Sequence, residues 1–239
     1  MNLIIDIGNT RAKLFAFDGD QLVDHIMCGH DLSEMHHFIE KNGCKRGILS
    51  TTAGLTKEAK QRIEELPFEL LQMTGQTPTP VRVEYRTPQT LGTDRLAAIV
   101  GAQAMRPDSN ILVIDCGTCV TYDFLDANGC YKGGNISPGL EMRLTALHQQ
   151  TARLPQVDAE GDVPEMGYDT ATAIRSGVIW GLRHEINGYI GRFKQKFPSL
   201  SVFLTGGDAK KLDMSEESCI FADNFIVPRG LNRILNYNK

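Results

Sequence analysis

Two short segments of the chain place an Asp-x-Gly turn directly after a run of apolar residues. They are LIIDIGNT at residues 3–10 and LVIDCGT at residues 112–118. A carboxylate at the end of a buried strand can hold a cation, and the backbone N–H groups of the following turn can bind phosphate oxygens. Glycine lets the backbone approach those oxygens closely. The two segments therefore indicate phosphate and metal chemistry around Asp6 and Asp115.

The similarity of the two segments continues beyond each turn, because a second apolar stretch and a turn cluster follow. These are residues 14–17 and 18–20 in the first copy, and residues 120–124 and 126–129 in the second. Each copy predicts a strand, a tight turn and a second strand. Either copy alone is typical of a simple hairpin with a capped Asp. The repetition favours two related lobes, which we assign to residues 1–109 and 110–239.

The segments between these strands have the spacing of helices. Apolar residues at helical spacing follow Ser33 and Thr56, which we expect to be N-caps. The longest helix is expected over residues 171–197, where Pro198 ends it. Residues 201–205 then predict a buried strand. Strands that alternate with helices indicate an α/β fold.

The composition excludes several classes of function. Of the 239 residues, 41% are hydrophobic and 23% are charged, which is typical of a globular protein with a sizeable core. The net charge is −4 and the basic residues are scattered, so we expect no nucleic-acid partner. No apolar run approaches the roughly 18 residues of a membrane span, and the start lacks the basic region of a secretory signal. We therefore expect a cytoplasmic protein without a membrane partner.

The six cysteines are interpreted as reduced cytosolic thiols, because a chain of this size builds its own core. They are Cys28, Cys44, Cys116, Cys119, Cys130 and Cys219. The spacing of Cys116 and Cys119 matches a redox or zinc motif. However, no second Cys or His pair completes a zinc site, and residues 120–124 predict a strand where a redox motif opens a helix.

The sequence contains neither a Walker phosphate loop nor a Rossmann fingerprint, so a different nucleotide fold is needed. The repeated turns resemble those of the acetate and sugar kinase, Hsp70 and actin superfamily, whose two RNase H-like lobes each carry an Asp-x-Gly phosphate hairpin. This resemblance implies an ATP cleft between the two lobes. Gly206 and Gly207, after the strand at 201–205, resemble the adenosine motif of that superfamily.

Further motifs in a fixed order resemble one branch of the superfamily, the type III pantothenate kinases. They are Tyr85 with LGTDR at 91–95, the turn at 115–118, GGNISPG at 133–139, TARLP at 151–155, and Thr170 with the segment to Gly177. The resemblance implies ATP-dependent phosphorylation of pantothenate to 4'-phosphopantothenate, the first step of coenzyme A biosynthesis. It also implies a homodimer.

The resemblance assigns roles residue by residue. Asp94 would be the catalytic base, although an Asp in the first turn of a helix has the same sequence context. Pantothenate would be bound by Tyr85, Gly92, Thr93, Asp94, Arg95 and Thr170. From the residues alone, Tyr85 is more typical of a half-buried core aromatic and Thr170 of a helix cap. Arg95 is equally a charge partner of Asp94 or a solvent-facing arginine.

ATP and its metal ions would be bound at the two turns. The ATP residues are Asp6, Ile7, Gly8, Asn9, Thr10, Arg11, Ala12, Lys13 and Thr118. Asp6 would hold Mg²⁺, which takes few protein carboxylates, and Asp115 would hold a monovalent cation, K⁺ or NH₄⁺. Lys13 would be a charge partner of the phosphates, or otherwise a solvated strand lysine.

Two other functions remain compatible with the sequence. A kinase of the same fold could act on another small alcohol or sugar, and only the pantothenate motifs argue against this. An ATP-binding regulatory protein without turnover is the second alternative. Asp6, Asp94 and Asp115 together favour catalysis, because a pure binding module needs no positioned base.

Overall fold

The computed structural model describes residues 1–212 and 220–239, which form two compact units. Unit 1 consists of Met1–Pro107, Gly129–Tyr131 and Phe225–Lys239. Unit 2 consists of Asp108–Asn128 and the described part of Lys132–Asn224. Cys219 lies outside the described residues. No helix within these residues is both long and apolar enough to cross a membrane.

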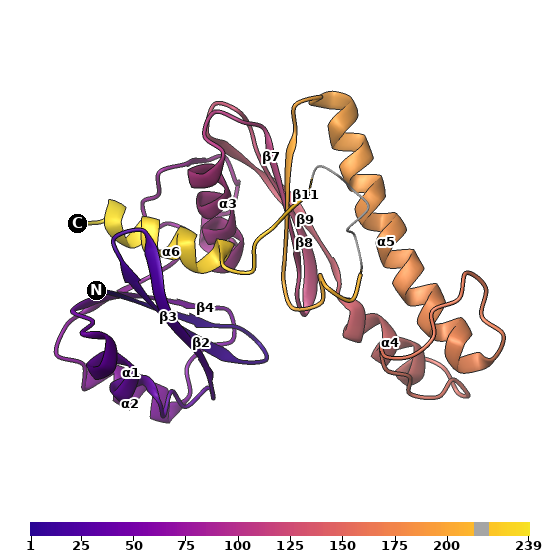
Figure 1. The fold of residues 1–239 in the computed structure, drawn as a ribbon, viewed down its shortest axis with the longest axis horizontal. Coiled ribbons are helices and arrows are strands. Elements are labelled where there is room, and N and C mark those ends of the chain that lie inside the picture. The colour runs from indigo at the N-terminus through magenta and orange to yellow at the C-terminus, as the bar shows by residue number, and fades with distance from the viewer. Residues whose placement is uncertain (213–219) are drawn as a thin grey trace. The chain divides into compact units, whose positions relative to one another are not determined.

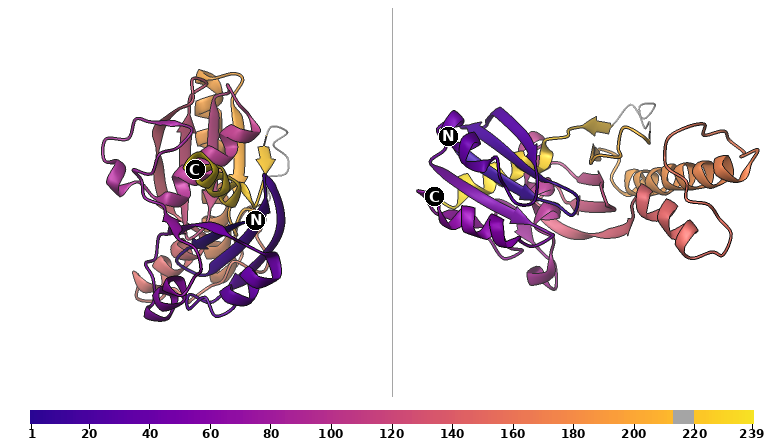
Figure 2. Two further views of the ribbon diagram at one scale, coloured as in Figure 1. Left: turned by 90° about the vertical axis from the view of Figure 1, so that its left-hand side faces the viewer. Right: turned by 90° about the horizontal axis from the view of Figure 1, so that it is seen from below.

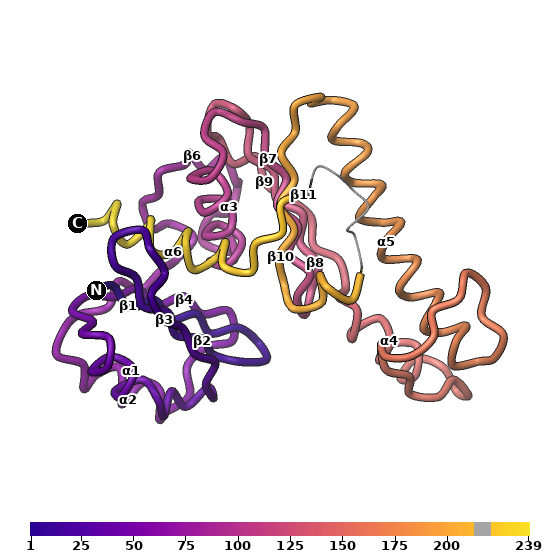
Figure 3. The backbone as a smooth tube through the Cα atoms, viewed as in Figure 1, coloured from indigo at the N-terminus to yellow at the C-terminus, as the bar shows by residue number. Residues whose placement is uncertain are grey.

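Unit 1 is built on a mixed sheet in the order β3-β2-β1-β4-β5. Its strands are β1 (Asn2–Ile7), β2 (Ala12–Asp18), β3 (Gln21–Cys28), β4 (Arg46–Thr51) and β5 (Leu70–Gln72). The first three strands form an antiparallel meander, which Figure 3 traces in indigo, and β4 and β5 continue the sheet in parallel with β1. The predicted strand, turn and strand at residues 3–17 are therefore confirmed.

Two short helices pack on this sheet. They are α1 (Met35–Asn42) and α2 (Lys57–Glu64). Thr56 caps α2 as expected, because its side chain accepts a hydrogen bond from the backbone N–H of Ala59. The expectation that Ser33 caps α1 was wrong: Glu34 is the N-cap and makes no side-chain capping bond. The Ser33 hydroxyl donates instead to the Glu34 carboxylate at 2.8 Å.

Helices α3 (Thr93–Met105) and α6 (Ile226–Tyr237) lie side by side in unit 1 (Figure 1). Their backbones approach so closely that only glycine fits at the contact. A Cβ at Gly230 would lie 1.8 Å from the carbonyl oxygen of Ala97, and one at Gly101 would lie 2.1 Å from that of Ile226. The last helix of the chain thereby completes the unit that the first strand begins.

Unit 2 contains a sheet in which β11, β10, β7, β8 and β9 are successive neighbours. The strands are β7 (Ile111–Cys116), β8 (Cys119–Leu125), β9 (Cys130–Pro138), β10 (Ser201–Thr205) and β11 (Ile220–Ala222). The first two residues of β9 belong to unit 1, where they pair with β6 (Arg82–Val83). β7 and β8 form the second predicted strand, turn and strand. Because Cys119 begins a strand, the Cys-x-x-Cys spacing opens no helix.

Helix α5 (Thr170–Lys196) is the long helix predicted from the apolar stripe, and α4 (Leu140–Gln149) precedes it. Its buried residues, among them Ile174, Leu182 and Ile186, form one core with residues of β7, β8 and β10. In Figure 2, α5 is the long orange helix. The alternative role of Thr170 as the N-cap of α5 is wrong. Asp169 is the N-cap and forms a capping box with Thr172, so Thr170 is the first residue inside the helix.

Candidate active site

The carboxyl end of β1 brings the first predicted group of functional residues together. Asp6 lies opposite Lys13 on β2 and opposite Ser50 on β4, so the sheet register sets a cation on one side and a hydroxyl on the other. The turn between β1 and β2 is closed by the N–H of Gly8, which donates to the carbonyl of Arg11 at 3.1 Å. Residues 9–11 are exposed at this turn.

Asp94 is joined to this part of the sheet through its neighbour. The hydroxyls of Ser50 and Thr93 are hydrogen-bonded at 2.8 Å in a buried position, and this bond fixes the first residue of α3 against β4. Asp94 follows in the first turn of the helix, where an acidic residue is favoured by the helix dipole. Asp94 is close enough for its charge to affect Asp6.

The electrostatics of Asp6 follow from this arrangement. Burial raises the pKa of Asp6 from 3.8 to about 6; Lys13 lowers it and the negative charge of Asp94 raises it. The charged carboxylate is therefore poorly compensated by the protein alone, and a cation would supply the missing charge. No group of three or more His, Cys, Asp or Glu side chains suited to a metal occurs within residues 1–212 and 220–239. One carboxylate suits Mg²⁺, which takes its other ligands from water and phosphates.

His30 was not found by the sequence analysis. It follows β3, and its Nε2 lies 2.9 Å from the carbonyl oxygen of Gly8 in the first turn. A carbonyl oxygen only accepts, so this ring nitrogen carries the hydrogen of the bond. Its own carbonyl accepts from the hydroxyl of Thr56 at 3.3 Å, which ties His30 to the start of α2. Only the folded sheet reveals this contact, since a single His after a strand carries no sequence signal.

Arg95, Tyr85 and Tyr131 form a second group in unit 1. Arg95 is only 6% exposed, and its guanidinium carbon lies 5.9 Å from the centre of the Tyr85 ring. Its Nη2 donates to the hydroxyl of Tyr131 at 3.1 Å. The two tyrosine rings are 6.1 Å apart. Gly92, Thr93, Asp94, Arg95 and Tyr85 therefore belong to one unit, and Tyr131 is an aromatic residue that the sequence motifs missed.

In unit 2, the backbone at Gly206 packs closely against the turn that follows β7. A Cβ at Gly206 would lie 2.4 Å from the carbonyl oxygen of Cys116 and 2.5 Å from Oδ1 of Asp115, and Gly206 has a positive φ of 96°. Gly206 is therefore required by the packing of its loop on the Asp115 turn. No atom in the described part of the chain would lie within 4 Å of a Cβ at Gly207. Thr118 is exposed at the tip of the turn.

A second glycine supports the same turn from the β9–α4 connection. The N–H of Gly139 donates to the carbonyl of Thr118 at 3.1 Å, and a Cβ at Gly139 would lie 2.4 Å from the carbonyl oxygens of Gly117 and Thr118. Thr170 is also in unit 2, exposed at the start of α5. The predicted pantothenate residues are thus divided between the two units.

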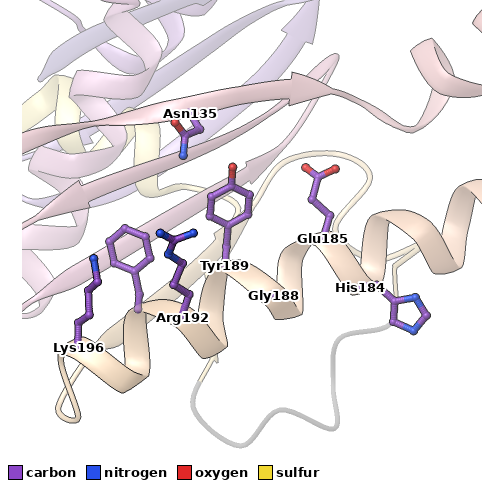
Figure 4. A pocket seen from close by; sticks show the side chains of 8 residues that line it. Asn135, His184, Glu185, Gly188, Tyr189, Arg192 and Lys196 are labelled. Atoms are coloured by element: carbon purple, nitrogen blue, oxygen red, sulfur yellow. The ribbon is translucent and has the colours of Figure 1, made fainter.

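Unit 2 also contains a cavity of about 550 Å³ between α5 and β9. Asn135, Glu185, Tyr189 and Arg192 are among the residues that line it (Figure 4). None of the predicted site residues is part of its lining.

Solved structures identify the class of fold. A Campylobacter jejuni protein described as a Baf family transcriptional activator is 20% identical, with a TM-score of 0.64 over 99% of this chain and 98% of that chain. Two proteins described as sugar kinases are each 13% identical. One, described as a 2-dehydro-3-deoxygalactonokinase of Sinorhizobium meliloti, has a TM-score of 0.57 over 100% of this chain and 99% of that chain. The other, described as an N-acetylmannosamine kinase of Listeria monocytogenes, has a TM-score of 0.56 over 99% of this chain and 97% of that chain. The chain has the sugar kinase and actin-like fold, as the sequence predicted.

Sequence comparison identifies the family. The family model for type III pantothenate kinase matches residues 2–192. A type III pantothenate kinase of Phocaeicola vulgatus is 50% identical over 239 residues, which is 100% of this chain and 99% of the relative. One of Bacteroides fragilis is 51% identical over 240 residues, with the same coverage. The chain belongs to the type III pantothenate kinase family, an enzyme family whose members use ATP and a divalent metal. The predicted family is confirmed.

Proposed function

We propose that this protein transfers the terminal phosphoryl group of ATP to the primary hydroxyl of pantothenate, with Asp94 as the base. The product is 4'-phosphopantothenate, and the reaction is the first step of coenzyme A biosynthesis. Family membership supports the reaction, and the placement of Asp6 and Asp94 in unit 1 supports their roles. The observation that carries them is the Ser50–Thr93 hydrogen bond, which holds Asp94 near Asp6 and the first turn.

Asp94 accepts the proton of the attacking hydroxyl as the phosphoryl group arrives in line. Phosphoryl transfer needs little covalent help from the protein, so positioning and charge compensation account for most of the catalysis. The contribution of a positioned base is about 10²–10⁴-fold in rate. The fixed start of α3 supports this role, because a base must be held within hydrogen-bond reach of the hydroxyl.

The two turns bind the ATP phosphates. The residues are Asp6, Ile7, Gly8, Asn9, Thr10, Arg11, Ala12 and Lys13 in unit 1 and Thr118 in unit 2. Asp6 holds Mg²⁺, which neutralises phosphate charge when it is bound. Asp115 holds the monovalent cation, K⁺ or NH₄⁺. Support for the Mg²⁺ site comes from the poorly compensated carboxylate of Asp6.

Pantothenate is bound by Tyr85, Gly92, Thr93, Asp94, Arg95 and Thr170. Arg95 binds the pantothenate carboxylate, since a guanidinium offers two parallel donors to a carboxylate. Its contacts with Tyr85 and Tyr131 support this role by fixing the side chain before the substrate arrives.

We further propose that the protein is a cytoplasmic homodimer. Helix α5 supports a dimer contact, because no atom of residues 1–212 and 220–239 would lie within 4 Å of a Cβ at Gly177, Gly181, Gly188 or Gly191. Small residues of this kind allow a second copy of the chain to approach closely. Light scattering after size-exclusion chromatography tests the dimer, and a monomeric mass at micromolar concentration would contradict it.

The reaction is tested by ADP release from the purified protein with ATP, Mg²⁺ and K⁺, with and without pantothenate. We expect release that depends on pantothenate, and a product one phosphate heavier by mass spectrometry. Replacing K⁺ by Na⁺ tests the monovalent cation. If the protein binds ATP but releases no ADP with pantothenate or any other small alcohol, the regulatory alternative is favoured. If ADP release depends on a different alcohol, that alcohol is the substrate.

A further inference from the structure

The guanidinium of Arg143, on α4, connects three parts of unit 2. Its Nε donates to the carbonyl of Pro138 at 2.8 Å. Its Nη2 donates to the hydroxyl of Ser137 at 2.8 Å and to the carboxylate of Glu185, on α5, at 2.5 Å. Simultaneous contacts of this kind use the planar fork of arginine, which the single ammonium group of lysine does not reproduce. Arg143 therefore fixes the end of β9 to α4 and α5.

Glu185 is the common acceptor of this network. Its other carboxylate oxygen accepts from the hydroxyl of Tyr122, on β8, at 2.7 Å. Burial alone would raise the pKa of Glu185, but the hydrogen bonds from Arg143, Tyr122 and Ser137 outweigh burial and leave the pKa below its usual value. Tyr122 also stacks on Tyr189 with ring centres 3.9 Å apart. Figure 4 shows Glu185 and Tyr189 extending from the same side of α5.

The network adjoins the phosphate turn of unit 2 along two stretches of chain. Ser137 and Pro138 directly precede Gly139, whose N–H donates to the carbonyl of Thr118 and whose backbone leaves no room for a Cβ. Tyr122 is four residues beyond Thr118 on β8, the strand that leaves the turn. Both segments next to the turn, Ser137–Gly139 and the start of β8, are therefore hydrogen-bonded to the Arg143–Glu185 ion pair.

We propose that Arg143 and Glu185 are positioning residues for ATP binding at the Gly117–Thr118 turn. The proposal rests on the proposed function, in which Thr118 binds ATP. Neither residue needs to touch the nucleotide: Arg143 holds the connection that supports the turn, and Glu185 holds Arg143. The two side chains are 22% and 26% exposed, and an ion pair in contact with solvent contributes little to the free energy of unfolding. We therefore expect substitutions here to affect the position of the turn more than the global stability.

The test compares Arg143→Lys with Arg175→Lys in the full-length protein. Arg175 is a matched control in the same unit, because it also pairs with an acid, Asp158, and donates to two carbonyls, those of Asp158 and Asp162. We expect the KM for ATP to rise about tenfold in Arg143→Lys, with the KM for pantothenate and the thermal midpoint little changed. Arg175→Lys should leave the KM for ATP within about twofold of the wild type.

Glu185→Gln provides a second variant if the first one folds poorly, and it should raise the KM for ATP in the same direction. An unchanged KM for ATP in both variants would overturn the proposal. An equal rise of the KM for ATP in Arg175→Lys would also overturn it. So would a rise in Arg143→Lys that is explained by a lower thermal midpoint.

Calorimetric titration with a non-hydrolysable ATP analogue separates failure of this proposal from failure of the proposed function. A wild type that binds the analogue without turnover contradicts the kinase, whereas weaker binding in Arg143→Lys still supports the positioning role.

Discussion

Replacing Asp6 by Asn should stabilise the ligand-free protein at pH 7.5, although it removes a residue that the proposed activity needs. Burial raises the pKa of Asp6 from 3.8 to about 6 in the folded protein, and the carboxyl returns to its usual value on unfolding. Because the folded state binds this proton more tightly, ionisation of Asp6 opposes folding. This destabilisation is absent below about pH 4 and complete above about pH 7.

The size of the effect follows from the same shift. Each pKa unit corresponds to about 1.4 kcal/mol, so the shift gives an upper limit of about 3 kcal/mol. The side chain keeps partial contact with solvent, and we therefore expect about 2 kcal/mol. For a chain of this length, that corresponds to a rise of about 4–8 °C in the thermal midpoint.

The assay is thermal and urea unfolding of the wild type and Asp6→Asn between pH 4 and pH 8, with a chelator to remove divalent metal. The advantage of the variant should grow from near zero at pH 4 to its full value near pH 7. Asp18→Asn, at an exposed position at the end of β2, is the matched control and should stay within about 0.5 kcal/mol of the wild type. A variant that is no more stable than the wild type at pH 7.5, after equal stability at pH 4, would refute the reasoning.

Three further substitutions test separate contacts. Asp94→Asn should retain ATP binding but lose about 10²–10⁴-fold in turnover, and an undiminished rate would remove it from the base role. His30→Ala should raise the KM for ATP about 3- to 10-fold by removing the donor to Gly8, while His30→Gln should restore part of the loss; steady-state kinetics of both variants decide this. Gly230→Ala should lower the free energy of unfolding by about 2–3 kcal/mol, because its Cβ would collide with the Ala97 carbonyl; an unchanged thermal midpoint would contradict that packing.

The elements that carry a local pattern could be predicted from the sequence. The strands around Asp6 and Asp115 were found because each is a short apolar run that ends in a turn residue, and both features act within a few residues. Helix α5 was found because its apolar stripe repeats over many turns. Its N-cap was missed by one residue, since both Asp169 and Thr170 are residue types that favour caps.

The contacts that assemble the candidate site could not be predicted in this way. The approach of Asp94 to Asp6 depends on a hydrogen bond between Ser50 and Thr93, and neither hydroxyl is distinguished from other serines and threonines in the sequence. The same is true of His30 and Gly8, which meet only because β3 and β1 belong to the same sheet. Pairings of this kind depend on tertiary structure, and local propensity carries no information about them.

The packing of α6 on α3 has a consequence for how the protein is made. The side chain of Asn2 donates to Asn232 at 2.8 Å and to Asn236 at 3.0 Å, so the beginning of the chain is bonded to its last helix. Domains usually fold in order as the ribosome synthesises them, with the amino-terminal one first. Unit 1 cannot be completed until residues 226–237 have been translated, because α6 packs against α3. Nascent chains that stall before residue 225 would lack α6 and would leave the face of α3 that α6 covers exposed to chaperones and proteases.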